Sequence, residues 1–266
     1  MTTVRPVCGK NKEPLPPRRA TEEGTRVCKL GVSHIFFDLD GTLIDPRDGI
    51  VRSLQYALEA MGAAIPETAS LECFIGPPLA GTFGHLLGTE DRERIQQAIA
   101  AYRVRFGTTG LFESRVYEGI RDALRTLHAS GRSLWIVTSK PTVYSEVIVE
   151  HHGLRPYFRK VYGSELNGDR TDKAVLIRYV LETEGLSPRE VLMVGDRAHD
   201  VLGARANGVG CLAVRWGFGS EDELESARPD AIVSSTVELT ALFRGAAERW
   251  GSRNPHSAIG DMDDGV

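Results

Sequence analysis

The sequence predicts an α/β fold: a doubly wound, Rossmann-like parallel sheet with an α-helical segment inserted after its first strand. Apolar runs alternate with amphipathic helical patterns along most of the chain, which is typical of parallel sheets covered by helices on both faces. The first run, His34–Phe37, ends in two aspartates one residue apart, followed at once by glycine. Between residues 46 and 110 only helical periodicity occurs, so an insert is expected there.

The helical insert is expected to comprise residues 46–115. Its apolar residues recur at helical spacing over four segments, at about residues 50–61, 68–73, 79–87 and 91–106. Between the second and third of these lies Phe74-Ile75-Gly76-Pro77-Pro78-Leu79. We expect it to form a rigid loop, because Gly-Pro-Pro cannot continue a helix.

The α/β core is expected to comprise residues 33–45 and 116–250, where strands and helices alternate again. Strands are predicted at about residues 133–137, 160–163, 191–194, 211–214 and 231–233. Helices are predicted at about residues 118–129, 141–152, 172–181, 197–207, 221–227 and 237–250. Residues 1–32 and 251–266 are polar, rich in Pro, Gly or Asp, and are predicted to be disordered tails.

Composition excludes several classes of function. A net charge of −4 does not support nucleic-acid binding, and no apolar run approaches the length of a membrane span. The tail at residues 1–32 lacks the apolar core of a signal peptide. Cys8, Cys28, Cys73 and Cys211 are scattered without zinc-site spacing, so we expect reduced thiols and a cytoplasmic location. Nothing in the sequence indicates the oligomeric state.

Four polar residues follow predicted strands and are expected to meet at one edge of the sheet. Asp38, Thr138 and Asp196 each come directly after a buried strand, and Lys173 begins a helix after another. Phosphoryl transfer needs a nucleophile, donors for the phosphoryl oxygens and a cation. Asp38 is therefore the candidate to attack phosphorus, with Asp40 as the candidate general acid and base.

A Mg²⁺ site is expected within the same group of residues. Asp38 and Asp196 would form a carboxylate pocket suited to this oxygen-preferring cation, and Lys173 would balance their charge. Each residue alone also has a simpler interpretation. Thr138 could only begin a turn, Lys173 could be a solvated helix residue, and Asp196 could be a helix N-cap. Their occurrence together after separate strands favours the active-site interpretation.

These segments resemble the four motifs of the haloacid dehalogenase-like hydrolases. Residues 38–45 (DLDGTLID) resemble the first motif and residues 137–141 (VTSKP) the second, Lys173 matches the third, and residues 195–200 (GDRAHD) match the fourth. The resemblance implies that Asp38 is the nucleophile, that Asp40 is the general acid/base and a metal ligand through its backbone carbonyl, and that Thr138 binds phosphate. It implies that Asp196 binds the metal, supported by Asp200. Further candidates for substrate binding in these motifs are Gly41, Thr42, Ser139 and Lys140.

The insert is similar to the cap of the phosphoglycolate-phosphatase-like subfamily, and residues 74–79 resemble the 5′-nucleotidase-like branch. Two departures stand out: Ser139 replaces the Asn common in phosphoglycolate phosphatases, and the N-terminal extension is not a family feature. The loop Ile75–Leu79, ending in Leu79 and with Phe83 behind it, is the candidate surface for the leaving group. Alternatively, this loop only turns the chain between two helices.

The expected function is therefore a Mg²⁺-dependent phosphatase that acts on a small phosphorylated metabolite, similar to phosphoglycolate or a nucleoside monophosphate. A phosphomutase remains an alternative, because it uses the same core and differs in how the insert excludes water. A non-catalytic module that binds a phosphometabolite is a second alternative. Dehalogenation is disfavoured, because the relatives that perform it lack the acid at the position of Asp40.

Overall fold

The computed structural model describes residues 31–251, and the side chains of residues 31–243. The predicted disordered tails lie almost entirely outside these residues, as do Cys8 and Cys28. Within the described range, no helix is both long enough and apolar enough to pass through a membrane. Cys211 is buried and forms no disulfide.

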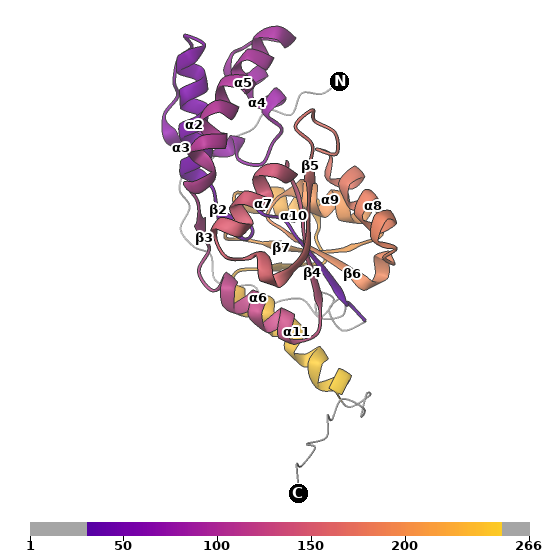
Figure 1. Cartoon of the computed structure of the whole chain (residues 1–266). Coiled ribbons are helices and arrows are strands. Elements are labelled where there is room, and N and C mark those ends of the chain that lie inside the picture. The colour runs from indigo at the N-terminus through magenta and orange to yellow at the C-terminus, as the bar shows by residue number, and fades with distance from the viewer. Residues whose placement is uncertain (1–30, 252–266) are drawn as a thin grey trace, which may run out of the picture.

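A six-stranded parallel sheet forms the centre of the protein (Figure 1). Its strand order is β5-β4-β1-β6-β7-β8, so successive strands are added on one side of β1 and then on the other. This change of direction opens a crevice at the carboxyl ends of the central strands. The strands are β1 (His34–Phe37), β4 (Ser133–Pro141), β5 (Phe158–Ser164), β6 (Val191–Gly195), β7 (Gly210–Val214) and β8 (Ala231–Val233).

Alternate side chains of the strands supply two hydrophobic clusters, one on each face of the sheet. Phe37 and Ile136 belong to one cluster, whereas their neighbours Phe36 and Trp135 belong to the other. The first face carries α6 (Ile120–Ala129), α7 (Thr142–His151) and α11 (Thr236–Gly251). The second carries α8 (Lys173–Glu184), α9 (Ala198–Ala206) and α10 (Glu221–Ala227). The predicted doubly wound sheet is confirmed.

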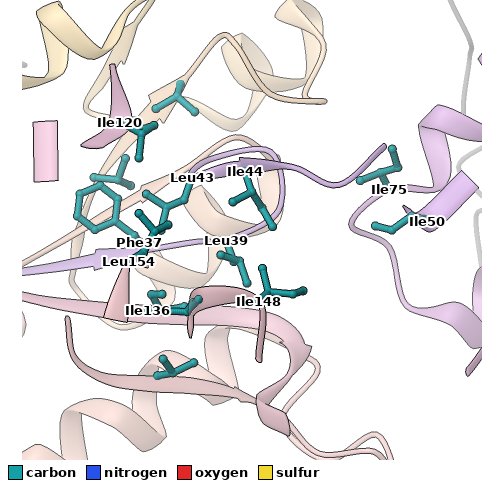
Figure 2. Close-up of a cluster of buried hydrophobic side chains, with 14 of the residues drawn as sticks. Phe37, Leu39, Leu43, Ile44, Ile50, Ile75, Ile120, Ile136, Ile148 and Leu154 are labelled. Atoms are coloured by element: carbon teal, nitrogen blue, oxygen red, sulfur yellow. The ribbon is translucent and has the colours of Figure 1, made fainter. Parts of the chain in front are cut away.

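The helical insert lies beyond the sheet, at the upper left of Figure 1. Its helices are α2 (Arg47–Ala60), α3 (Thr68–Leu71), α4 (Leu79–Leu86) and α5 (Arg92–Thr108), near the predicted positions. Helix α5 packs against both α2 and α4. The first hydrophobic cluster extends into the insert: Figure 2 shows Ile50 and Ile75 together at one end and Phe37 and Ile136 toward the sheet. The division into separate insert and core domains stays a prediction.

Two short strands join the insert to the core, and the sequence analysis did not predict either. β2 (Ile44–Asp45) pairs antiparallel with β3 (Arg115–Val116), with Ile44 opposite Val116. Pairs of residues are too short to show a periodicity of two. Strand β4 also continues to Pro141, beyond the predicted end of this strand at about residue 137, and its register with β5 shifts between Val137 and Pro141. Four short 3₁₀ helices occur in the described part of the chain: η1 (Glu72–Phe74), η2 (Gly110–Phe112), η3 (Arg155–Tyr157) and η4 (Pro188–Glu190).

The buried sheet makes a prediction about stability. Ile136 is 0% exposed on β4, between Phe37 of β1 and Val161 of β5, whereas Leu202 on α9 is 53% exposed. Ile136→Ala should lower the free energy of unfolding by about 2–5 kcal/mol, because it leaves a cavity in the core. Leu202→Ala removes a side chain of equal size and should change stability by no more than about 0.5 kcal/mol. Urea denaturation of both variants measures the difference, and equal losses would contradict this assignment of the core.

Candidate active site

A buried cluster of charged side chains lies at the carboxyl end of β1. Asp38 directly follows β1, Lys173 begins α8, and Asp200 lies in the first turn of α9. Lys173 Nζ lies 2.7 Å from Asp38 Oδ1 and 2.8 Å from Asp200 Oδ1, and it donates to the Val137 carbonyl at 3.0 Å. Both carboxylates and the lysine are at most 5% exposed. A single lysine therefore bridges two carboxylates that come from different elements.

Asp196 follows β6 and is enclosed by backbone on two sides. Its Oδ2 accepts a hydrogen bond from the backbone N–H of Phe218 at 2.7 Å, and its Oδ1 accepts one from Thr42 Oγ1 at 3.4 Å. Gly41 adopts φ +82°, and a Cβ at Gly41 or Gly217 would come within 2.1 or 2.3 Å of Asp196 Oδ2. Only glycine fits at these two positions while Asp196 keeps its place.

The donor set suits a divalent cation. Asp38, Asp196 and Asp200 each offer an oxygen within 4.8 Å of the others, and all three are buried. Lys173 contacts Asp38 and Asp200 directly, and among the described residues no other lysine or arginine forms an ion pair with the three carboxylates, although His199 Nε2 lies 3.9 Å from Asp200 Oδ1. Burial, together with the neighbouring Asp200 and Asp38, holds the pKa of Asp196 well above its ordinary value. A hard cation such as Mg²⁺ would remove this penalty, and the residues present fit it.

Lys173 determines how the other charges behave. Burial disfavours its charged form, but Asp200 and Asp38 outweigh burial and raise its pKa, so the lysine stays protonated. Burial also disfavours the charged form of Asp200, which by itself would raise its pKa. The contact with Lys173 outweighs burial and lowers the pKa of Asp200, so this carboxylate is ionised. The pKa of Asp38 is raised, chiefly by burial, and the attraction of Lys173 only partly opposes this shift. A further cation beside Asp38 would therefore favour its ionised form.

Asp40 lies at the entrance of the cluster and pairs with Lys140. Lys140 Nζ is 2.6 Å from Asp40 Oδ2, and it also lies 4.6 Å from the centre of the Phe106 ring. The second oxygen, Asp40 Oδ1, is buried without a hydrogen-bond partner in the part of the chain that the structure describes. A buried carboxylate oxygen without a partner is costly and marks a place where a ligand can bind.

A cavity of about 450 Å³ opens above these residues, between the sheet and the helical insert. From the core it is lined by Asp38, Asp40, Thr138, Ser139, Lys140, Tyr144, His199 and the segment 164–168. From the insert it is lined by Ile50, Phe74, residues 76–80, Gln96, Ile99, Tyr102, Arg103 and Phe106. Carboxylates and hydroxyls thus lie at its base, and aromatic side chains lie above them.

The structure places the residues predicted to bind substrate in three different settings. Leu79, Thr138, Ser139 and Lys140 line the cavity together with Asp38 and Asp40. Gly41 and Thr42 instead contact Asp196. Phe83 does not line the cavity: its side chain is 0% exposed and packs edge-on against Tyr102, with ring centres 6.2 Å apart. Phe83 belongs to the interior of the insert because its place on α4 faces α5.

Several cavity residues were not identified from the sequence. Tyr102 and Phe106 recur four residues apart on α5, a spacing that predicted only a buried helix face. Tyr144 and Arg103 carried no signal. The segment 164–168, by contrast, follows β5 at the same edge of the sheet as Asp38 and Asp196, so its position in the chain could have identified it.

A family model described as "Haloacid dehalogenase-like hydrolase" matches residues 35–214, more than half of the chain. Among curated proteins, a 5′-nucleotidase from Pseudomonas aeruginosa is 49% identical over 82% of this chain and 98% of its own. Tyrosine-protein kinase PtkA from Mycobacterium tuberculosis is 35% identical over 76% of this chain and 69% of its own. Among solved structures, a predicted phosphatase from Clostridium acetobutylicum is 40% identical with a TM-score of 0.76, covering 79% and 97% of the two chains.

The chain therefore belongs to the haloacid dehalogenase-like hydrolase family. The match spans the helical insert and five of the six strands of the sheet, β8 lying beyond it, and it includes the aspartates after β1 and β6, Thr138 and Lys173. The chain also resembles a 5′-nucleotidase and a predicted phosphatase over most of its length. The family match and these two similarities place the protein among the phosphatases of that family.

Because three carboxylates are crowded together, we predict that the stability of the metal-free protein depends on pH. The raised pKa of Asp196 means that the folded state binds this proton more tightly than the unfolded chain. In EDTA, stability should therefore fall as pH rises above about 4, the pKa of an unperturbed Asp. Asp196→Asn removes this loss, so the Tm of the variant relative to wild type should increase from about pH 4 to 8.

Thermal unfolding in EDTA across this range measures the effect, at about 2–4 °C for each kcal/mol in a domain of this size. Asp48→Asn, at an exposed position on α2, is the matched control and should show a constant difference from wild type. Mg²⁺ should raise the Tm of wild type at neutral pH and have little effect on Asp196→Asn. If the difference in Tm between Asp196→Asn and wild type stayed constant across this pH range, the raised pKa of Asp196 would be contradicted.

Proposed function

We propose that this phosphatase is Mg²⁺-dependent, forms an aspartyl-phosphate, and hydrolyses nucleoside monophosphates. The observation that carries the proposal is the arrangement at the base of the cavity. A lysine-bound Asp38, a second carboxylate with an oxygen lacking a partner, and the Thr138 hydroxyl face the same space. These are the parts that phosphoryl transfer requires. A cytoplasmic location, expected from the sequence, is part of the proposal.

Asp38 is the proposed nucleophile. Lys173 holds its Oδ1 at 2.7 Å, which orients the carboxylate and assigns attack to the other oxygen, Oδ2. That oxygen forms a bond to phosphorus while the bond to the leaving oxygen breaks. The Thr138 hydroxyl, 1% exposed and facing the cavity, is proposed to bind a phosphoryl oxygen.

Asp40 is the proposed general acid and base. Lys140 fixes Asp40 Oδ2 at 2.6 Å, so the oxygen without a partner, Oδ1, is assigned to the proton transfer. In the first step Asp40 gives a proton to the leaving oxygen. In the second it takes a proton from the water that attacks the aspartyl-phosphate, which releases inorganic phosphate and restores Asp38.

Mg²⁺ would be held by Asp38, Asp196 and the backbone carbonyl of Asp40, with Asp200 in support. When bound, it offsets the negative charge of the carboxylates and of the phosphoryl group. Asp200 then has two roles in this chain: it contacts Lys173 at 2.8 Å, and its Oδ2 accepts the backbone N–H of Arg197 at 3.1 Å. It thereby ties the start of α9 to the charged cluster.

The cavity supports a leaving group larger than glycolate. Its volume of about 450 Å³ falls in the range of sites for whole cofactor-sized or drug-sized ligands. Tyr102 and Phe106 stack with ring centres 5.3 Å apart, and Phe106 packs edge-on against Tyr144. All three rings line the cavity, which gives it a partly aromatic wall for the leaving group. The 5′-nucleotidase relative supports the same substrate class.

Hydrolysis of a nucleoside 5′-monophosphate tests the proposed activity. Phosphate release should require Mg²⁺, should stop in EDTA, and should return with excess Mg²⁺. Asp38→Asn keeps the size of the side chain but not the nucleophile, so its turnover should fall by orders of magnitude, because phosphate monoesters hydrolyse extremely slowly without catalysis. Asp48→Asn makes the same change of side chain at an exposed position, so this control variant should retain activity.

Near-normal turnover of folded Asp38→Asn would rule out the aspartyl-phosphate. Conversion of a sugar phosphate to its isomer without release of phosphate would favour the phosphomutase alternative. Binding of nucleotide by wild type without turnover in Mg²⁺ would favour the non-catalytic module.

Substrate selection by the insert makes a separate prediction. Leu79 lines the cavity and Phe83 does not, although both lie on α4. Leu79→Ala should lower kcat/KM for a nucleoside monophosphate by roughly 10–200-fold, the range for an apolar pocket contact. It should affect p-nitrophenyl phosphate much less, because that leaving group needs little from the insert. Phe83→Ala should chiefly lower Tm and affect both substrates alike; equal losses from Leu79→Ala would assign Leu79 to packing instead.

A further inference from the structure

Two arginines cross between the core and the helical insert, in opposite directions. Arg197, in the core, donates from Nη1 to the Ile75 carbonyl of the insert at 2.6 Å. Arg103, on α5 of the insert, donates from Nη2 to the Leu166 carbonyl of the core, also at 2.6 Å. The segments that accept these bonds, residues 74–79 and 164–168, both contribute to the lining of the cavity. The two contacts are therefore reciprocal and lie at the cavity wall.

Arg197 is held firmly on the core side. It is the N-cap residue of α9, between Asp196 and Asp200 in the chain. Its Nε lies 2.9 Å from Glu223 Oε1 of α10, and the same oxygen accepts the Ala198 N–H at 2.8 Å. The arginine side chain is 16% exposed. One end of the guanidinium is thus fixed to Glu223 and the other is directed at the insert, which uses its several donors in a rigid geometry.

The loop of the insert is shaped to meet this arginine. The Ile75 side chain is 1% exposed and lies in the hydrophobic cluster beside Ile50 (Figure 2). The next residue, Gly76, has φ +103°, and a Cβ there would lie 3.1 Å from Arg197 Nη1. Pro77 and Pro78 then restrict the backbone. A side chain at position 76 would press on the guanidinium, so glycine permits the close approach of carbonyl and arginine.

The second contact is exposed to solvent, whereas the first is partly buried, so we expect it to contribute less. Arg103 itself lines the cavity, and Leu166 lies in the turn that follows β5. Hydrogen bonds from the Glu165 N–H to the Asp169 carbonyl, at 2.9 Å, and from the Gly168 N–H to the Glu165 carbonyl, at 3.0 Å, close this turn. The Leu166 carbonyl is therefore presented by an ordered segment, as the Ile75 carbonyl is.

We propose that Arg197 and Arg103 are positioning residues that hold the helical insert closed over the cavity. Opening the insert would separate each guanidinium from its carbonyl, so both bonds favour the closed form specifically. Arg197 also joins the segment between Asp196 and Asp200 directly to the loop proposed to meet the leaving group. Loss of one charge-assisted hydrogen bond corresponds to roughly 10–100-fold in the equilibrium between closed and open forms. The consequence for substrate turnover rests on the proposed function, but the contact itself does not.

The variants Arg197→Met and Arg103→Met remove the donors and keep most of the side-chain length. Arg205→Met is the matched control, because Arg205 of α9 donates to the Ala227 and Arg228 carbonyls within the core. Hydrogen–deuterium exchange of residues 72–86 and 158–171, measured without substrate, reports closure. Arg197→Met should speed exchange at residues 72–86, Arg103→Met should speed exchange at residues 158–171, and Arg205→Met should change neither.

In kinetics, Arg197→Met should raise KM for a nucleoside monophosphate by roughly 10–100-fold and affect p-nitrophenyl phosphate less. Arg197→Lys should restore only part of this, since one ammonium cannot serve Glu223 and the Ile75 carbonyl with the same geometry. Unchanged exchange at residues 72–86 in both Arg197 variants, with a lowered Tm similar to that of Arg205→Met, would overturn the proposal by assigning Arg197 to the support of α9. Faster exchange in an enzyme that releases no phosphate would leave the contact established and reject the proposed function instead.

Discussion

The burial of three carboxylates around Lys173 is the constraint on which the rest of the active site depends. Ionised groups are costly to remove from water unless they are paired, and here one lysine contacts two of the carboxylates while Asp196 stays in excess. Such a cluster lowers the stability of the fold, but it suits the binding of a cation and a phosphoryl group. The ends of β1 and β6, the starts of α8 and α9, and the glycines that contact Asp196 all meet there.

Recognition is divided between the two parts of the chain. In the proposed mechanism the core supplies the groups that act on the phosphoryl unit, and these are the same for every phosphate ester. The insert supplies aromatic and apolar side chains that line the cavity above them, which is where the proposed mechanism places the leaving group. Lys140 belongs to both parts of the site, because it binds Asp40 of the core and lies over the ring of Phe106 from the insert. Lys140 thus connects the proposed general acid to the insert through two direct contacts.

The strands and the charged residues that follow them were predictable because parallel strands bring their carboxyl ends to one edge. Asp38, Asp196 and Lys173 could be assigned in this way without coordinates. Residues of the insert could not, because helical spacing identifies a buried face but not which part of that face borders a cavity. Phe83 and Tyr102 illustrate this: the first was expected at the substrate and packs inside, and the second was expected inside and lines the cavity. The Lys140–Asp40 pair depends on residues 100 positions apart, which local patterns cannot connect.

The ribbon of β2 and β3 has an evolutionary consequence. The insert leaves the core at Ile44 and returns at Val116, and these two residues are cross-strand partners. Directly opposite residues in an antiparallel pair have Cα atoms about 4.5–5.5 Å apart, so a short turn would close the same gap. A gene segment encoding the whole insert could therefore be lost, lengthened or exchanged between relatives without displacing a single strand of the sheet. Exchange of this segment, through crossovers at its two ends in the gene, would replace the insert's side of the cavity wall while Asp38, Asp196 and Lys173 stay in the core.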